Sequence, residues 1–333
     1  MIKGTTKLLG VIGHPIAHSL SPAMHNAAIS HLGVDFVYLA FPVKPEDLEV
    51  ALAGFGAIGV RGFSITIPHK QAILPLLSEV SPIARAIGAV NTVYLTDKGW
   101  CGTNTDVEGF LAPLQTGGFH NFQSDSDPPQ PPLTRGENLL KVPLLKGDLG
   151  GSPGLKTRSA GGSDWSQKVA VILGNGGAAR AVVAGCAQLG CAQIHVVGRS
   201  AQNLAEFQQS WVNSPMPVHN LQVHTWDNLS MLISQADLLV NTTPVGMYPH
   251  GEKSPVDAAA LDRISAGAIV YDLIYNPSPT QFLKDAQLGG ARAIDGLEML
   301  VQQGAAALKI WLDTESVPVD VMRQALRQHL GLY

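Results

Sequence analysis

Residues 169–180 read VAVILGNGGAAR. Five apolar residues run into the spacing Gly174-x-Gly176-x-x-Ala179, and an alanine-rich, helix-like stretch follows. In a dinucleotide-binding turn the first glycine makes the tight turn, the second lets the backbone approach a pyrophosphate, and a small third residue keeps the helix close to the sheet. Another strand-like run, IHVVGRS, comes next at residues 194–200. This context, more than the glycine spacing itself, predicts a Rossmann-type unit that binds a dinucleotide.

Similar apolar runs alternate with helix-like stretches on both sides of this unit. Before it stand KLLGVIG, DFVYLAF and GFSITI, and after its first strand come runs at Ile194–Val197, Leu221–His224, Leu238–Asn241, Ile269–Asp272 and Ala291–Ile294. Alternating strands and helices predict parallel sheets with right-handed crossovers. Because 333 residues are many for one hydrophobic core, we expect two α/β domains, the second of Rossmann type, with a cleft between them.

The composition fits a well-buried α/β protein and gives no sign of a nucleic-acid or membrane partner. Charged residues make up 14% of the chain, against about 25% in typical soluble domains. The net charge is −4, which does not favour binding to a phosphate backbone. Three cysteines form no disulfide framework, and neither CxxC nor HExxH metal spacing occurs. Without a signal peptide or a long apolar run, a cytoplasmic protein is expected. A homodimer is compatible with the sequence, which does not fix the oligomeric state.

One segment departs from this composition. Residues 121–165 contain 6 Pro and 7 Gly, or 29%, against 17% for the whole chain, and no helical or strand periodicity runs through them. Such composition is typical of low-complexity sequence, so we predict a disordered insertion over 117–165; a weak interaction motif around Leu144 is the alternative. The predicted organisation is a substrate domain at 1–116, the insertion, a Rossmann domain at 166–296, and C-terminal helices at 297–333 that pack back toward the substrate domain.

The end of the second Rossmann strand bears on the choice of cofactor. An NAD-binding domain usually carries Asp or Glu there, to bond the adenosine ribose. This chain has Gly198, Arg199 and Ser200 instead. Arg199 can bind a 2′-phosphate and stack on adenine, so NADP is predicted rather than NAD. The alternative is that Arg199 is an ordinary surface arginine.

The run SITIPHK, residues 64–70, places a lysine at an unfavourable position. A strand-like alternation meets Pro68, which suits the first turn of a helix and would place Lys70 near a helix start. The helix dipole and burial both disfavour a cation there, so a nearby carboxylate is needed to keep Lys70 charged.

Two other positions have a purely structural interpretation. Thr105-x-x-Glu108 fits a capping box with Asp106 as a first-turn acid, and Ser21 followed by Pro22 fits a helix N-cap.

Eight motifs together resemble the shikimate dehydrogenase family, in order and over the whole chain except the insertion. They are GVIGHPIAHSLSPAMHNAA, SITIPHK, GAVNTV, GTNTD, GNGGAAR, NTTPVGM, YDLIYNPSPT and DGLEMLVQQGAAAL. The resemblance implies reversible, NADP-dependent reduction of 3-dehydroshikimate to shikimate, in the pathway to chorismate and aromatic amino acids. Lys70 and Asp106 would then be the catalytic pair that moves the proton at the C3 hydroxyl.

The resemblance also implies a set of binding residues. Ser19 and Ser21 would bind the shikimate carboxylate, and the other substrate contacts would be Thr66, Asn91, Tyr275 and Gln303. Cofactor contacts would be Gly174, Asn175, Gly176, Gly177, Ala178, Arg199, Ser200, Thr242, Leu273 and Gly296, the last two facing the nicotinamide.

Two departures from the family pattern leave alternatives open. The family often has Asn before the arginine and a second basic residue five positions beyond that Asn, where this chain has Gly198 and Asn203. One phosphate clamp is therefore missing, which leaves a quinate/shikimate dehydrogenase with mixed NAD and NADP use as an alternative. A catalytically silent NADP-binding regulator is another.

Overall fold

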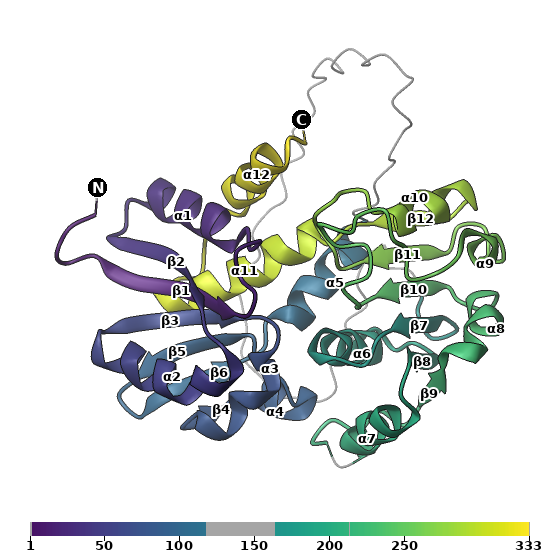
Figure 1. The fold of residues 1–333 in the computed structure, drawn as a ribbon, viewed down its shortest axis with the longest axis horizontal. Helices are drawn as coiled ribbons and strands as arrows, with labels where there is room; N and C mark the ends of the chain where they lie inside the picture. Colours follow the sequence, from purple (N-terminus) through teal and green to yellow (C-terminus); the bar gives the residue numbers. More distant parts are fainter. Residues whose placement is uncertain (1, 118–163, 213, 333) are drawn as a thin grey trace, which may run out of the picture. The chain divides into compact units, whose positions relative to one another are not determined.

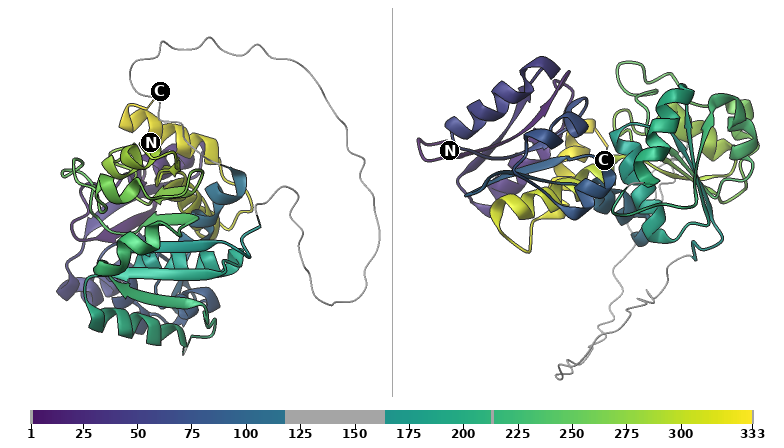
Figure 2. Two further views of the ribbon diagram at one scale, coloured as in Figure 1. Left: turned by 90° about the vertical axis from the view of Figure 1, so that its right-hand side faces the viewer. Right: turned by 90° about the horizontal axis from the view of Figure 1, so that it is seen from below.

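The computed structural model describes residues 2–117, 164–212 and 214–332, which form two six-stranded sheets covered by helices (Figure 1). The low-complexity insertion predicted at 117–165 falls almost wholly on residues 118–163 and so lies outside the described residues. In the right-hand view of Figure 2 the purple N-terminal strands and the green strands of the later chain belong to separate sheets. None of the described helices is long and apolar enough to cross a membrane.

The second sheet has the strand order of a dinucleotide-binding fold. All its strands are parallel, and their order is β12-β11-β10-β7-β8-β9. Numbered from its own first strand, this is the 3-2-1-4-5-6 order of the Rossmann fold. The strands are β7 (Val169–Leu173), β8 (Gln193–Gly198), β9 (Leu221–Thr225), β10 (Leu238–Asn241), β11 (Ile269–Asp272) and β12 (Arg292–Ile294). The helices of this part are α6 (Gly177–Leu189), α7 (Ala201–Val212), α8 (Leu229–Ile233), α9 (Ala258–Leu261) and α10 (Gln281–Leu288).

The first sheet is mixed, in the order β2-β1-β3-β5-β6-β4. Its first three strands pair in parallel, whereas β5 and β6 form an antiparallel hairpin from the run NTVYLTDKGWCG. The strands are β1 (Lys7–Gly13), β2 (Phe36–Pro42), β3 (Val60–Ile65), β4 (Glu79–Val80), β5 (Thr92–Thr96) and β6 (Gly99–Thr103). The helices are α1 (Ser21–Leu32), α2 (Leu48–Ala57), α3 (His69–Ala72), α4 (Pro82–Ile87) and α5 (Asp106–Thr116).

Two C-terminal helices, α11 (Leu297–Leu312) and α12 (Val319–Leu330), complete the core of the first sheet. In Figure 1, α12 lies beside α1 and α11 runs along α5, and both pairs are in contact. Trp311 of α11 donates its indole N–H to the backbone oxygen of Val93 in β5, at 2.9 Å. Gly62 in β3 makes room for this ring, because a Cβ at that position would collide with it. The indole is thereby buried with its one polar group satisfied.

Three local expectations about helix starts are wrong. Pro68 is the residue before α3 and not part of its first turn. The residue before α1 is Leu20, so Ser21 is the first helical residue and its side chain does not cap the helix. Thr105 precedes α5 but makes no capping bond, because its hydroxyl contacts Asn91 and Thr92 instead. In two of the three cases the helix boundary lies one residue from the expected position. In the third, long-range contacts of the Thr105 hydroxyl replace the local cap.

Candidate active site

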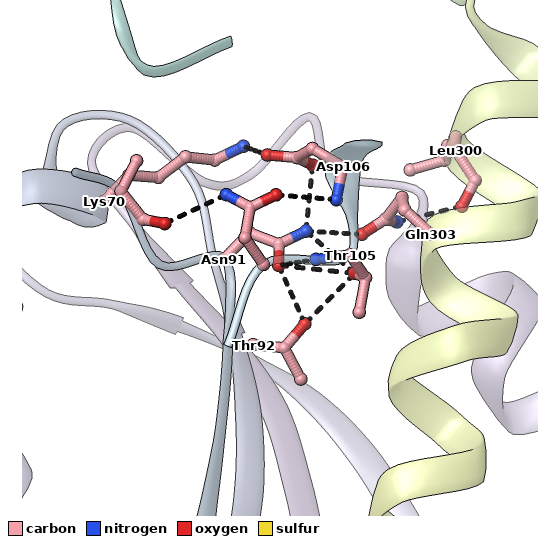
Figure 3. A network of polar contacts seen from close by, with 9 residues as sticks. Lys70, Asn91, Thr92, Thr105, Asp106, Leu300 and Gln303 are labelled. Atoms are coloured by element: carbon pink, nitrogen blue, oxygen red, sulfur yellow. Dashed lines mark hydrogen bonds and ion pairs between the residues drawn. The ribbon is translucent and has the colours of Figure 1, made fainter. Parts of the chain in front are cut away.

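Lys70 and Asp106 are brought together, although 35 residues separate them in the chain. The Lys70 ammonium donates to Asp106 Oδ2 at 2.5 Å, as Figure 3 shows. The side chains are 16% and 7% exposed, so little water screens the pair. Lys70 lies on α3, which is a single turn of four residues. A helix of that length has almost no macrodipole. The dipole argument for a strained cation is therefore wrong, and the carboxylate itself accounts for the charge at Lys70.

Asp106 is held from three sides. Its Oδ1 accepts from the Asn91 amide at 2.8 Å, its Oδ2 accepts from Lys70, and its backbone N–H donates to Asn104 Oδ1 at 3.0 Å. The Asn104 side chain is anchored in turn on the Ala89 backbone oxygen. Because Asp106 is the first residue of α5, the positive end of that helix also favours its negative charge. The carboxylate is thus fixed in one orientation before any ligand arrives.

Asn91 is the centre of the network in Figure 3. Its Oδ1 accepts from the Thr105 backbone N–H at 2.8 Å and from the Thr92 hydroxyl at 3.0 Å. Its Nδ2 faces Asp106 Oδ1, Thr105 Oγ1 and, at 3.3 Å, Gln303 Oε1. An amide has two N–H hydrogens, so these three acceptors already exceed what Asn91 can supply. The side chain is 2% exposed and supports Asp106 from behind.

Lys70 and Asp106 line a cavity of about 190 Å³, whose wall contains residues from the region of the first sheet and from the region of the second. Its wall includes most of the predicted substrate residues, namely Ser19, Ser21, Thr66, Tyr275 and Gln303, together with the predicted cofactor residues Ala178, Leu273 and Gly296. Other lining residues were not expected from the sequence: Val11, His18, Ser64, Ile65, Met299 and Leu300. Asn91 does not belong to this lining, which leaves Gln303 as the amide that faces the cavity.

The glycine turn is built as its sequence predicts. Gly174 has φ +102°, and a Cβ there would lie 2.8 Å from Thr242 Oγ1, so both conformation and space require glycine. The Thr242 hydroxyl fixes this residue against the turn by donating a hydrogen bond to the Leu173 backbone oxygen at 2.7 Å. Gly176 precedes α6, a helix of 13 residues without a side-chain cap, and a Cβ at Gly176 would meet nothing. The first N–H groups of α6 are therefore available to an anion.

Lys70 also touches this turn. A Cβ placed on Gly177 would lie 3.4 Å from Lys70 Cδ, which puts the aliphatic part of the lysine against the start of α6. At the neighbouring strand end, Asn175 lies next to Gly198, since a Cβ on Gly198 would come within 3.4 Å of Asn175 Oδ1. Arg199 and Ser200 follow on the exposed end of β8. The Ser200 hydroxyl accepts from the Asn203 N–H at 3.3 Å.

Leu273 and Gly296 meet at the ends of β11 and β12. A Cβ at Gly296 would collide with the Leu273 backbone oxygen, so only glycine permits this approach. Asp272, which the sequence reading did not single out, organises the loop that carries Leu273 and Tyr275. Its carboxyl accepts from the Ile274 N–H, from Asn241 and from Thr280, and burial raises its pKa to about 7. Among the described residues, no three His, Cys, Asp or Glu side chains cluster as a metal site would.

Comparison with known proteins identifies the family of this chain. Residues 11–93 match the model of the shikimate dehydrogenase substrate binding domain, and residues 296–327 match that of the shikimate 5′-dehydrogenase C-terminal domain. A shikimate dehydrogenase (NADP(+)) from Trichormus variabilis is 59% identical over 332 residues, covering 100% of both chains. The chain belongs to the shikimate dehydrogenase family. A relative of the same name from Synechocystis is 52% identical and covers 99% of this chain and 98% of its own.

Solved structures of shikimate dehydrogenases share the fold. One in complex with NADP+ has a TM-score of 0.77 and 33% identity, covering 99% of this chain and 98% of its own. The Thermus thermophilus shikimate 5-dehydrogenase in complex with shikimate has a TM-score of 0.73 and 30% identity, covering 98% and 100%. These matches confirm the predicted fold class of an N-terminal substrate domain and a C-terminal Rossmann-type NADP domain.

Proposed function

We propose that this chain reduces 3-dehydroshikimate to shikimate with NADPH, reversibly, and that Lys70 and Asp106 carry the proton transfer. The observation that carries the proposal is the 2.5 Å ion pair of these two residues in the wall of a cavity that also reaches the start of α6. Its family membership makes the chain an NADP-dependent oxidoreductase.

Reduction of the ketone leaves an alkoxide, which must gain a proton. Lys70 would donate that proton from its ammonium, and in the reverse direction its amine would accept the hydroxyl proton. Asp106 would hold the ammonium in place and stabilise its charge, and it would accept a hydrogen bond from a neighbouring ring hydroxyl. Asn91, which has no amide hydrogen left for a ligand, keeps Asp106 oriented, so the constellation needs little rearrangement on binding.

The substrate carboxylate would bind at Ser19 and Ser21, which line the cavity at the start of α1 and can donate from their hydroxyl groups. Thr66, Tyr275 and Gln303 line the remaining wall and would bind ring hydroxyls or exclude water. Asn91 is proposed as a supporting residue, whereas the family resemblance made it a direct substrate contact.

The residues present fit NADP. Gly174 makes the turn and Gly176 leaves the space that a pyrophosphate needs, and Asn175, Gly177 and Ala178 form the rest of the turn at the free N–H groups of α6. Arg199 and Ser200 would bind the 2′-phosphate, and Thr242, Leu273 and Gly296 would border the nicotinamide. When bound, NADPH supplies the hydride. The chain's part is to hold the reacting carbon beside it and to move the proton.

Replacement of Lys70 tests the assignment. We expect Lys70→Ala to lower kcat by about 10²- to 10⁴-fold while cofactor affinity is retained, since a positioned acid contributes that much. The matched control is Lys168→Ala, which breaks another lysine–aspartate pair, Lys168–Asp237 at 2.7 Å, away from the cavity. Steady-state kinetics with shikimate and NADP+ give kcat, and fluorescence titration gives NADPH affinity. A Lys70→Ala enzyme with wild-type kcat would refute the proton-transfer role.

The same assay separates the alternatives. A quinate/shikimate dehydrogenase would oxidise quinate at a rate comparable to shikimate and would accept both NAD+ and NADP+. A silent regulator would bind NADPH yet turn over neither substrate. We expect shikimate with NADP+ to be the preferred combination.

Three further expectations stay predictions. We propose a small molecule as the partner, no nucleic acid, and a cytoplasmic location, in keeping with the net charge of −4. Light scattering after size exclusion tests whether the chain forms a homodimer.

A further inference from the structure

Tyr38, a residue outside the cavity lining, is fixed behind the predicted carboxylate site. It lies in β2, is 0% exposed, and has both backbone groups bonded to the Asn26 side chain of α1, at 2.9 Å and 2.8 Å. Its ring stacks on His25 with centroids 4.2 Å apart, and Trp311 packs against it at 5.8 Å. A tyrosine held on all sides in this way has one hydroxyl position.

That hydroxyl reaches two serines that line the cavity. It donates to Ser64 Oγ at 2.9 Å, and the Ser21 side chain is its second hydrogen-bonding neighbour. Ser21 begins α1 and Ser64 lies in β3, so the phenol links two elements that are far apart in the sequence. Both serines are 6% exposed and both face the cavity.

The number of hydrogens on the Tyr38 and Ser64 hydroxyls decides which of the two donates in the hydrogen bond between them. Burial raises the pKa of Tyr38, so the phenol keeps its single hydrogen at working pH. A serine that accepts this hydrogen has its own O–H hydrogen left for another acceptor. With the phenol donating to Ser64, the free hydrogen of Ser64 is available on the side of the cavity. Without the phenol, both serine hydroxyls could rotate and donate to the protein instead.

We propose that Tyr38 is a positioning residue that presents serine O–H donors to the carboxylate of the substrate. The inference rests on the proposed function, which places that carboxylate at Ser19 and Ser21, and it adds Ser64 as a donor whose direction Tyr38 sets. Tyr38 contacts Ser64 but is not among the residues that line the cavity, so it is not expected to touch a reacting atom. Its effect therefore falls on substrate binding and not on the proton transfer at Lys70.

Tyr38→Phe removes the hydroxyl and keeps the ring. We expect the KM for shikimate to rise about 10- to 100-fold, in line with the loss of one oriented hydrogen bond to a charged group. The kcat and the KM for NADP+ should stay within about twofold, because uniform binding is lost and the transition-state contacts remain. The matched control is Tyr271→Phe: Tyr271 is also fully buried, but its hydroxyl has no hydrogen-bond partner in the part of the chain that the structure describes. We expect its KM for shikimate to be unchanged.

An analogue with a hydroxymethyl group in place of the carboxylate makes the test specific. If Tyr38 acts on the carboxylate, wild-type and Tyr38→Phe enzymes should have the same KM for this analogue. Ser64→Ala should raise the KM for shikimate to a similar extent, and the double variant should be no worse than the poorer single one. This second variant also keeps the proposal testable if Tyr38→Phe does not fold.

Two results would overturn the inference. One is an unchanged KM for shikimate in a folded Tyr38→Phe enzyme, and the other is an equal rise for shikimate and for the analogue, which would indicate a general distortion. Failure of the proposed function is distinguishable, because the wild-type enzyme would then not oxidise shikimate with NADP+ at all.

Discussion

His25 should make the folded protein sensitive to acid, by an amount that follows from its burial. The imidazole is 0% exposed, neither ring nitrogen has a hydrogen-bond partner among the described residues, and burial lowers its pKa to about 3 from 6.5. The folded protein therefore keeps His25 neutral, while the unfolded chain binds a proton below pH 6.5. Stability from this group is fully present above pH 6.5 and is lost as pH falls toward 3. The full loss corresponds to about 5 kcal/mol, of which about 2 kcal/mol is lost by pH 5.

The pH dependence of the wild-type protein would not reveal this loss, because Asp272 acts in the opposite direction. Its carboxyl is 0% exposed and has a pKa of about 7 when folded, against 3.8. Lowering the pH from 8 to 5 therefore raises the free energy of unfolding by about 2.5 kcal/mol, because the folded state binds a proton at Asp272. The two effects nearly cancel, and only a comparison with a variant isolates either of them.

Urea unfolding of wild type and His25→Gln at pH 8 and pH 5 provides that comparison. The difference in unfolding free energy between the two proteins should shift by about 2 kcal/mol between these pH values, in favour of the variant at pH 5. His25→Leu should give the same shift although its absolute stability differs, since neither replacement titrates. A shift below about 0.5 kcal/mol in both variants would show that His25 gains a proton partner or water in the folded state, and would refute the reasoning.

Three other predictions concern separate parts of the molecule. Asp272→Asn should show the reverse shift, losing about 2.5 kcal/mol relative to wild type between pH 8 and pH 5 in the same unfolding assay; no shift would mean that Asp272 is ionised when folded. Gly62→Ala places a methyl group against the Trp311 indole and should destabilise the protein by roughly 1–3 kcal/mol, measured by urea unfolding, whereas a neutral result would mean that the indole can move. Arg199→Ala should raise the KM for NADP+ roughly 10- to 100-fold and leave that for NAD+ nearly unchanged; equal effects on both would exclude a contact with the 2′-phosphate.

The sequence predicts the second sheet better than the first, for a physical reason. Strand β7 is 5 residues of continuous apolar sequence ending in a turn whose glycines have fixed geometric tasks, so its structure is encoded locally. The first sheet includes an antiparallel hairpin and a two-residue strand, β4, which no periodicity would reveal. Its core also depends on α11 and α12, about 200 residues away in the chain.

The sequence suggests candidate residues for the site, whereas their contacts with one another come only from the structure. The prediction that Lys70 and Asp106 form a pair rests on the resemblance to a family, because sequence spacing alone does not connect residues 70 and 106. Thr105 satisfies the local rule for a capping box, yet the Thr105 hydroxyl accepts a hydrogen bond from Asn91, 14 residues away in the chain, instead of capping the helix. Asp272 carries no local signal, since a single Asp at a strand end is common, and only the buried structure shows that three donors converge on it. Tyr38 had the pattern of an ordinary core residue.

The return of α11 and α12 to the first sheet has a consequence for synthesis on the ribosome. Strands β1 to β6 leave the exit tunnel first, but Leu308, Trp311 and Met322, which share a buried cluster with Leu9 and Tyr38, are translated last. Residues between Ile12 and Trp100 can form one buried cluster by themselves. The cluster that includes Leu9 and Tyr38, however, stays incomplete while the Rossmann domain is being made. A premature stop codon before residue 297 would release a polypeptide whose Rossmann half could fold while its other half exposed the apolar surface of that cluster to aggregation and to chaperones.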